Sequence, residues 1–475
     1  MPVRAGDTRR YRGAMPGAKP AGTWHGSVAA RTLAALALLA LAAIAVRAPP
    51  ARADSDLQWR APVTVASGAG HRGPWRMNAS VFDYVDDATV TWLAGGDAAV
   101  AWVDQARKDV FVQRYGPGGE ARLPAPVNVS GSPGVFSWLP RLATAPGDPE
   151  TLYVAWQEIV FSGVSHGGEI FFARSRDGGR SFGAPVNLSR SRAGDGKGRL
   201  FADYWHNGSL DLAVGPGGTV YVAWTEYEGP LRLARSRDGG TTFSAPTRIA
   251  GGAGEPPARA PALAAGDDGV VHLAWTVGEQ RAADIRHARS EDAGRTFTRA
   301  RRVDPGPGHA DAPKLALGAD GTLHLAYALS PDGPLRRYDL RYTRRPAGGD
   351  AFAPARTVSA PLPRGFEGAA FPHLALAGDG RVYLACELFS LRGPYPPDAL
   401  GILYSRDGGD SFTDTAVVPR TAGAGINGSQ QGLLMDKLAV APDGAIALVN
   451  SKFRRGQGSH VRLLRAAPPP RAAAD

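Results

Sequence analysis

Four segments of the chain can be laid on one another residue for residue, and this repeat constrains the fold more than any other feature. They are SRDGGRSFGAP (175–185), SRDGGTTFSAP (236–246), SEDAGRTFTRA (290–300) and SRDGGDSFTDT (405–415). Alternating apolar stretches such as IFFAR precede them. Further upstream lies a second recurring block, as in LAAGDDGVVHLAW (263–275). It consists of an apolar run, a turn and a second apolar run that ends in Ala-Trp. Self-similarity at a spacing of about 50 residues is typical of propellers and solenoids.

One unit of the repeat predicts four antiparallel strands, which is one propeller blade. The first hairpin turn of each unit falls at Gly96-Asp97, Asp148, Gly217-Gly218, Asp268-Gly269, Asp320-Gly321, Asp379-Gly380 and Asp443-Gly444. These turns favour seven blades, with six as the alternative. The last unit supplies only three strands, and residues 58–65 resemble the fourth strand of the other units. We therefore predict an all-β propeller, residues 54–465, whose ring is closed by this N-terminal strand, because closure removes exposed sheet edges.

The acidic residue of each repeated turn has a structural interpretation. A carboxylate can accept hydrogen bonds from the N–H groups of its own turn, while the neighbouring glycines allow positive φ. The four residues are Asp177, Asp238, Asp292 and Asp407. They lie on separate units, which argues against a shared calcium site. The aromatic residues Phe182, Phe243, Phe297 and Phe412 are expected to pack under these turns.

The N-terminal segment has the pattern of a secretory signal. An apolar run, Thr32–Val46, follows Arg31 and leads to small residues at 51–53. We predict a signal peptide over residues 1–53, cleaved after Ala53, and a secreted or periplasmic protein; an uncleaved anchor is the alternative. Residues 1–53 contain eight basic residues and one acidic residue, Asp7, so they contribute +7 of the total net charge of +10. The mature chain is then near +3, so nothing indicates a nucleic-acid partner.

Two further segments have simpler interpretations. Cys386, the single cysteine, stands where other units place Trp, so it is expected to be a small buried apolar residue with no disulfide or thiolate metal site. Residues 466–475 are expected to be a disordered tail.

The four turns match the S-x-D-x-G-x-[ST]-[FW] pattern of the bacterial neuraminidase repeat, so the chain resembles the sialidase-like propeller superfamily with its Asp-box repeats. The resemblance covers residues 57–465 and implies a glycan-directed protein. In sialidases three arginines grip the substrate carboxylate, an Asp is the acid/base, and a Tyr with a Glu partner is the nucleophile. This chain has no F/Y-R-I-P motif, and no tyrosine follows Tyr404.

Candidate site residues lie on the face at which the first strand of each blade starts and the second ends, here called the loop face. Just before the first-strand Leu-Ala come Arg141, Asp211, Ala262, Lys314, His373 and Lys437; after the second-strand Ala-Trp come Asp104, Glu158, Glu226 and, one place earlier, Glu387. Carboxylates near cations around one funnel suit polar sugar binding or general acid/base chemistry. Salt bridges between blades are the alternative interpretation.

The longest insert between units, residues 189–209, adds aromatic and acidic residues of the kind that bind sugars. From these groups we predict Glu158, Glu226 and Asp203 as catalytic candidates and Arg141, Lys314, Lys437, His373, Tyr204 and Trp205 as substrate-binding candidates. His166, His206 and His373 lack the spacing of a metal site. No metal and no cofactor are predicted.

Two hypotheses about function follow. In the first, the protein is an exported propeller acting on or binding glycans, and any catalysis is glycoside hydrolysis of the exo-sialidase type. In the second, it is a non-catalytic propeller that binds a protein or a cell-surface polymer through the same face. Both expect a glycan or another polar, anionic ligand, no nucleic acid, and no membrane contact beyond the targeting segment. The oligomeric state is left open.

Overall fold

The computed structural model describes residues 56–469 except 94, 149, 160–167, 191–197, 202–203, 208, 227–228, 253, 267–268, 279–281, 335, 391–396, 424–425 and 428–433. The predicted signal peptide and residues 470–475 therefore lie outside the described residues. The described part is all-β, with one short 3-10 turn, η1 (Pro216–Gly218). None of its helical segments is long and apolar enough to cross a membrane.

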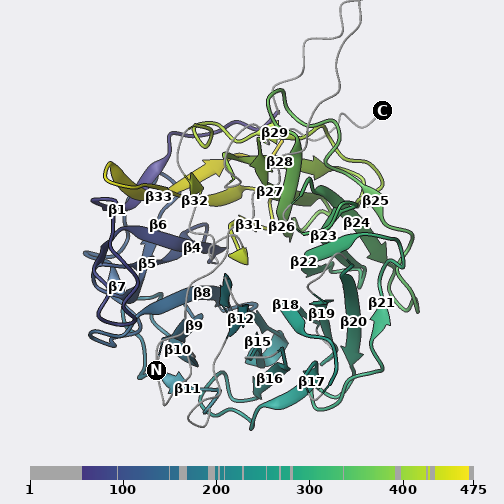
Figure 1. The fold of residues 1–475 in the computed structure, drawn as a ribbon, viewed down its shortest axis with the longest axis horizontal. Coiled ribbons are helices and arrows are strands. Elements are labelled where there is room, and N and C mark those ends of the chain that lie inside the picture. The colour runs from purple at the N-terminus through teal and green to yellow at the C-terminus, as the bar shows by residue number, and fades with distance from the viewer. Residues whose placement is uncertain are drawn as a thin grey trace, which may run out of the picture. The chain divides into compact units, whose positions relative to one another are not determined.

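Seven four-stranded antiparallel sheets stand in a ring, so the prediction of a seven-bladed propeller is confirmed (Figure 1). Within blades 1 to 6, strands adjacent in sequence pair with each other, as expected where hairpin turns connect them. Blade 1 contains β4 (Val85–Trp92), β5 (Ala98–Asp104), β6 (Asp109–Tyr115) and β7 (Val127–Asn128). Blade 2 contains β8 (Ser137–Thr144), β9 (Leu152–Glu158), β10 (Glu169–Ser175) and β11 (Val186–Asn187). Blade 3 contains β14 (Leu210–Val214), β15 (Val220–Thr225), β16 (Leu231–Ser236) and β17 (Thr247–Ala250).

The remaining blades follow the same plan. Blade 4 contains β18 (Ala258–Ala265), β19 (Val271–Val277), β20 (Asp284–Ser290) and β21 (Arg301–Arg302). Blade 5 contains β22 (His309–Leu317), β23 (Leu323–Ser330), β24 (Asp339–Arg345) and β25 (Arg356–Thr357). Blade 6 contains β26 (Gly368–Leu376), β27 (Val382–Phe389), β28 (Ala399–Ser405) and β29 (Ala416–Val417). Two short hairpins, β2 (His71–Arg72) with β3 (Phe82–Asp83) and β12 (Gly198–Phe201) with β13 (Tyr204–Asn207), lie outside the blades.

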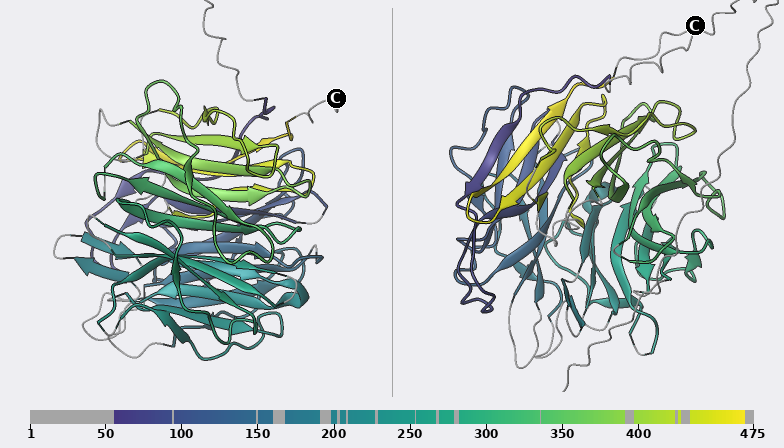
Figure 2. Two further views of the ribbon diagram at one scale, coloured as in Figure 1. Left: turned by 90° about the vertical axis from the view of Figure 1, so that its right-hand side faces the viewer. Right: turned by 45° about the horizontal axis from the view of Figure 1, so that its top comes forward.

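Blade 7 joins the two ends of the propeller. It contains β31 (Leu438–Val440), β32 (Ile446–Arg454), β33 (Gly458–Ala466) and the N-terminal β1 (Val63–Gly68), with β30 (Ile426–Asn427) also paired to β32. Purple β1 lies beside yellow β33 in Figure 1 and in the right-hand view of Figure 2. The strand predicted over 58–65 thus closes the ring. Its pairing runs from the Trp59–Ala466 bridge to Gly68, with a bulge between Thr64 and Ala66.

The ordered chain continues a little beyond the predicted propeller boundary. The Ala467 N–H donates to the Gln58 carbonyl, and Arg381 donates to the Pro469 carbonyl. The first residues of the predicted tail therefore pack on the propeller.

The repeated turns between third and fourth strands are built around their Asp residues. In blade 3 the Ser236 hydroxyl donates to the Asp238 carboxylate at 2.7 Å and accepts from the Gly240 N–H. The Thr242 N–H and hydroxyl both donate to the same carboxylate, at 2.8 and 2.6 Å. Asp177, Asp292 and Asp407 make equivalent bonds. These carboxylates therefore hold the turns together, as predicted.

The aromatic residues of the turns connect neighbouring blades rather than packing only under their own turn. Phe243 meets the third-strand Phe172 of the preceding blade edge-on, with ring centroids 4.9 Å apart. Phe412 meets Tyr342 in the same way, also at 4.9 Å. Blade 5 repeats the contact from a turn without the Ser-x-Asp pattern, since Phe352 meets His287 at 5.2 Å.

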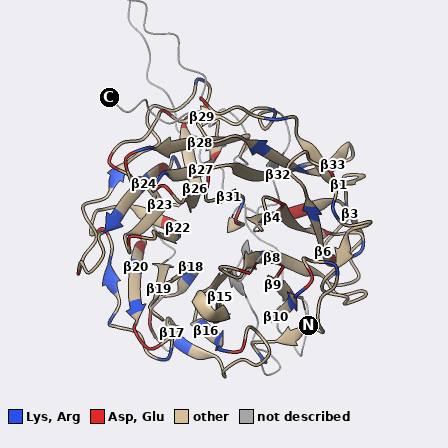
Figure 3. Ribbon diagram, turned by 180° about the vertical axis from the view of Figure 1, so that it is seen from behind, with Lys and Arg blue, Asp and Glu red and all other residues tan. Residues whose placement is uncertain are grey.

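Arginines on the third strands form a second connection between blades. Each lies near the end of its strand and reaches the next blade; Figure 3 shows lysine and arginine recurring around the ring on these strands. The pairs are Arg114 with Glu150, Arg174 with the Gly239 carbonyl, Arg235 with the Ala293 carbonyl, Arg344 with the Gly408 carbonyl and Arg465 with the Gly116 carbonyl. The last pair crosses the closure from blade 7 to blade 1.

The core lies between the blades. Trp156, Trp224 and Trp275, from the second-strand Ala-Trp pairs, are fully buried, and so is Cys386 at the equivalent position. Burial raises the pKa of the Cys386 thiol above its usual range, as expected for a small core residue.

Candidate functional site

A β-bulge in the first strand of most blades sets up the candidate site. In β8, β18, β22 and β26 a residue with positive φ is followed by proline, and the register shifts there. The four bulges are Leu139-Pro140, Ala260-Pro261, Ala312-Pro313 and Phe371-Pro372; Asp87 in β4 also has positive φ. A bulge re-aims the residue that follows it. The sequence carries this signal as a recurring x-Pro-x-Leu-Ala pattern. The turns and Ala-Trp pairs used to align the repeated units did not reveal it.

The residues after these bulges occupy equivalent positions around the ring. Arg141 lies opposite Ala155, Lys314 opposite Ala326, and His373 opposite Ala385. Asp211 takes the same position in blade 3, opposite Ala223. Each therefore lies opposite the second-strand alanine that precedes Trp156, Trp224, Tyr327 or Cys386, on the inner edge strand of its blade.

Two of these side chains, Arg141 and Lys314, contact Asp436, which lies two residues before β31 of blade 7. Asp211 and His373 interact with Asp436 electrostatically. We name the five residues the axial cluster: Arg141, Asp211, Lys314, His373 and Asp436. Lys314 forms an ion pair with the Asp436 carboxylate. Arg141 Nε lies 3.5 Å from Asp436 Oδ2 and 3.8 Å from Asp211 Oδ1. Arg141 also donates to the Leu434 carbonyl at 2.9 Å. Two cations from separate blades thus hold one carboxylate at the axis.

The two aspartates of the axial cluster have opposite electrostatic environments. Burial, followed by the Asp436 charge, raises the pKa of Asp211 to about 6. Burial also opposes ionisation of Asp436, but Lys314 and Arg141 together lower its pKa to about 2. The Asp436 side chain is about one-third exposed, whereas Asp211 is nearly covered (32% and 9%). Asp436 is therefore ionised at neutral pH, and Asp211 lies close to its titration point.

His373 is the unsatisfied member of the axial cluster. It is 2% exposed, and neither ring nitrogen has a hydrogen-bond partner in the described part of the chain. Burial and then the charges of Lys437 and Lys314 hold the pKa of His373 well below its usual range, so the ring is neutral. A neutral imidazole offers one donor and one acceptor, and leaving both unmade inside a protein is costly. This ring can hydrogen-bond a ligand.

Lys437 and Glu387 form a buried ion pair beside His373. The remaining carboxylate candidates lie elsewhere. Glu158 accepts from the Trp156 indole at 3.1 Å, and burial raises its pKa. Glu226 accepts from Arg232 at 2.5 Å and from the Trp224 indole at 3.4 Å. Both therefore lie on the tryptophan side of their strands, engaged within their own blades.

The insert between blades 2 and 3 is described only by its backbone. Tyr204 pairs with Phe201 and Trp205 with Leu200 in the β12–β13 hairpin. Asp203 lies outside the described residues.

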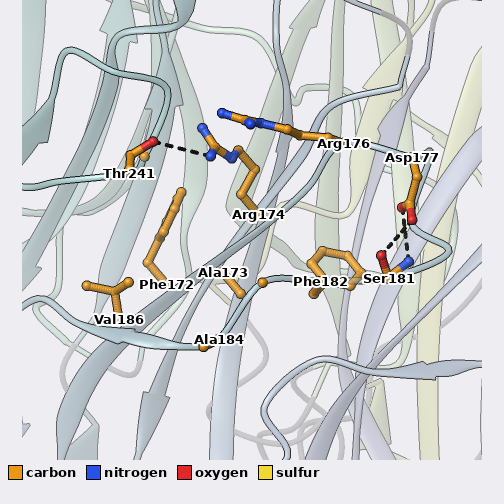
Figure 4. Close-up of a pocket in the computed structure, with 12 residues that line it drawn as sticks. Phe172, Ala173, Arg174, Arg176, Asp177, Ser181, Phe182, Ala184, Val186 and Thr241 are labelled. Carbon is orange, nitrogen blue, oxygen red and sulfur yellow. Dashed lines mark hydrogen bonds between the residues drawn. The ribbon is translucent and has the colours of Figure 1, made fainter.

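A separate pocket of about 460 Å³ lies at the rim between blades 2 and 3 (Figure 4). Phe172, Phe182 and Val186 form its apolar wall, with Arg174 and Asp177 among its polar groups. Arg174 is already bonded to the Gly239 carbonyl and Thr241, and Asp177 to Ser181 and Ser175. These polar groups already stabilise the turn and the contact between blades 2 and 3, so they are not available to a ligand. The axial cluster is therefore the stronger candidate site.

No family model matches the chain, and no curated protein matches it in sequence. Its fold is that of known propellers. The polysaccharide lyase Uly1 is 12% identical, with a TM-score of 0.51 over 87% of this chain and 100% of that one. A PL25 ulvan lyase bound to -[GlcA(1-4)Rha3S]- is 13% identical, with a TM-score of 0.50 over 85% and 95%. The Hadza microbial sialidase Hz136 is 16% identical, with a TM-score of 0.40 over 71% and 66%. The likeness to the two lyases is one of fold.

Proposed function

We propose that this protein is an exported propeller that binds acidic glycans over the axial cluster and cleaves them as a glycoside hydrolase. The observation that carries the proposal is the convergence of Arg141 and Lys314 on the Asp436 carboxylate. A guanidinium and an ammonium placed together form a strong site for a carboxylate or sulfate. Neutral His373 beside them supplies hydrogen bonds for sugar hydroxyls. The ulvan lyase, bound to a saccharide that contains GlcA, supports an acidic sugar as the ligand.

The hydrolytic part of the proposal rests on the two aspartates. Environments that push the pKa values of two carboxyls apart are typical of acid/base pairs in glycosidases. The oxygens of Asp211 and Asp436 are at most 7.3 Å apart, because they lie 3.8 and 3.5 Å from the same Arg141 atom. This limit is compatible with the carboxyl separations of glycosidases. Asp211 would donate the proton to the leaving oxygen, and Asp436 would act as the ionised partner.

A tyrosine nucleophile of the sialidase type is less well supported. Burial raises the pKa of Tyr404, the last tyrosine of the chain, and its hydroxyl contacts Asp56 and Arg406. Burial likewise raises the pKa of Tyr383, to about 12. Since neither phenol is activated, the aspartate pair is the better source of acid/base chemistry, and a sialoside is one substrate among several to test.

The test is a panel of aryl glycosides, including glucuronide and sialoside, together with an array of acidic and neutral glycans. We expect binding restricted to acidic glycans. Lys314→Met should weaken it at least about tenfold, because one of two charged contacts is removed. Arg237→Met, at an exposed position on the rim, is the matched control and should bind normally. Absence of binding on the whole array together with absence of cleavage would overturn the proposal.

A non-catalytic propeller is the second candidate, favoured by one observation. Asp436 already pairs with both Arg141 and Lys314, and Glu158 and Glu226 are engaged within their own blades. Such a protein would hold a protein or cell-surface polymer on the loop face. In that case Arg141→Ala would weaken capture of the polymer, and no glycoside would be hydrolysed by the wild type or the variant.

Export is part of the proposal and rests on the apolar run before residue 47. Expression of the full chain in a bacterial host tests it. We expect the protein in the periplasm or medium with its N-terminus at Asp54. A protein retained in the cytoplasm at full length would contradict this part alone.

A further inference from the structure

The exposed large apolar side chains of the described residues gather in one segment. They are Trp75, Met77 and Val81, which are 46%, 44% and 69% exposed, and all three lie between β2 and β3. Soluble proteins rarely concentrate such side chains on one surface without a binding role. We name this segment, residues 73–81, the Trp75 platform.

The Trp75 ring is supported from behind by other aromatic residues. Its centroid lies 5.5 Å from that of Trp138, 5.9 Å from Phe136 and 6.3 Å from Phe82. The supporting rings are buried. Trp75 therefore has one side fixed against the core while nearly half of its surface remains open.

Hydrogen bonds hold the platform in place. Asn78 donates to the Ile159 carbonyl at 2.8 Å and accepts from the Phe136 N–H at 3.1 Å. The Arg76 N–H donates to the Ser80 hydroxyl at 2.6 Å, and Met77 takes a positive φ of 52°. A surface ordered in this way loses little conformational entropy when a ligand binds.

Cations surround the platform. Arg76 is exposed next to Trp75, and Arg72 is exposed with its guanidinium 6.0 Å from the centre of the Phe82 ring. The Lys108 ammonium lies 4.9 Å from the centre of the Phe136 ring. The strands that flank the platform, β2 and β3, carry one carboxylate, Asp83, so these three cations outnumber it. The charge around Trp75 thus favours an anionic ligand.

The platform adjoins the strand that leads to the axial cluster. Trp138, against which Trp75 packs, lies three residues before Arg141 on β8. Because of the bulge, Trp138 and Arg141 lie opposite Gln157 and Ala155, which are two residues apart on β9. At about 3.3 Å per residue, Trp138 is therefore roughly 7 Å along the strand from Arg141. A ligand that reaches both must be longer than one sugar.

We infer that the Trp75 platform is a second subsite that binds the continuing chain of an acidic polysaccharide whose charged unit occupies the axial cluster. The inference rests on the proposed function and names its substrate as a polymer. The open face of Trp75 stacks on the apolar C–H face of a sugar ring, and Arg72 and Arg76 pair with its carboxylate or sulfate groups.

The experiment compares a long and a short ligand on the full mature chain. The probes are polymeric and disaccharide forms of hyaluronan, chondroitin sulfate and polysialic acid, with dextran as the neutral control, and Kd is measured for each. Trp75→Ala should weaken binding of the polymer about tenfold, because an aromatic contact is lost. It should leave disaccharide binding unchanged. Trp75→Phe should retain most of the affinity, and Lys314→Met should weaken both ligands.

The outcomes separate this inference from the proposed function. Equal effects of Trp75→Ala on polymer and disaccharide, or no effect on either, would overturn the second subsite while leaving the axial site standing. Failure of both ligands to bind the wild-type protein would overturn the proposed function and, with it, this inference. A wild-type dimer in light scattering that Trp75→Ala converts to a monomer would show that a second copy covers the platform, which also overturns the inference.

Discussion

The Lys437 ammonium donates a hydrogen bond to the Glu387 carboxylate inside the ring, where both side chains are shielded from solvent. The pair joins blade 7 to the second strand of blade 6, next to the axial cluster. Removing two charges from water costs several kcal/mol per ion, which their mutual attraction offsets only while both are present.

Lys437→Met is therefore expected to destabilise the protein strongly. It leaves the Glu387 carboxylate buried without its cation, and the free energy of unfolding should fall by about 3–5 kcal/mol. The double variant Lys437→Met/Glu387→Leu removes both charges and should recover most of that loss. Urea unfolding measures both values. A double variant as unstable as the single one would contradict the explanation.

The Asp211 carboxyl predicts a pH dependence of stability. Its pKa is raised to about 6, above its ordinary value, so between about pH 4 and pH 6 the native state binds more protons than the unfolded state. The free energy of unfolding must then decrease as the pH rises through this window. Between pH 4 and pH 7, the free energy of unfolding of the wild type should fall by up to about 3 kcal/mol more than that of Asp211→Asn. Parallel pH profiles of the two proteins would show that Asp211 has an ordinary pKa.

The fold was largely predictable because its signals are local. Each blade repeats its own turns and alternation, and the orphan strand at 58–65 could be matched to the strand missing from the last unit. The positions of Arg141, Lys314 and His373 could be aligned for the same reason. Asp436 could not be found in this way, since it precedes a short strand and meets Lys314 only through closure of the ring.

The face on which Glu158 lies follows from the alternation of side chains along its strand. Side chains alternate along a strand, so Glu158 shares the face of Trp156, while Gln157 shares that of Ala155. The hydrogen bond from the Trp156 indole to Glu158 agrees with this alternation. Counting residues along the strand from the alanine of each Ala-Trp pair is enough to place Glu158 and Glu226 on the face that points away from the axial cluster.

The third-strand arginines predict a stability effect at the contacts between blades. Arg235 donates to the Asp292 and Ala293 carbonyls of the next blade, at 3.3 and 2.8 Å. Arg235→Met should lower the free energy of unfolding by about 1–3 kcal/mol, because charged hydrogen bonds are lost and their carbonyl acceptors are left without a partner. Arg237→Met, two residues further and exposed, should change it by less than about 0.5 kcal/mol. If both variants lost the same free energy of unfolding, the contact between blades would not be the cause of the destabilisation.

The repeated turns predict sensitivity to acid. Hydrogen bonds from Thr242, Ser236 and the turn backbone lower the pKa of Asp238 far below its ordinary value, and the same arrangement lowers that of Asp292. A carboxyl whose pKa is depressed on folding stabilises the native state above its unfolded pKa of about 4, and that stabilisation is lost as the pH falls toward the native value. Asp238→Asn cannot titrate, so we expect its unfolding free energy to change less than that of the wild type between pH 5 and pH 2. Thermal unfolding in a series of buffers measures the difference. A variant that loses stability as steeply as the wild type would show that these turns do not set the acid limit of the propeller.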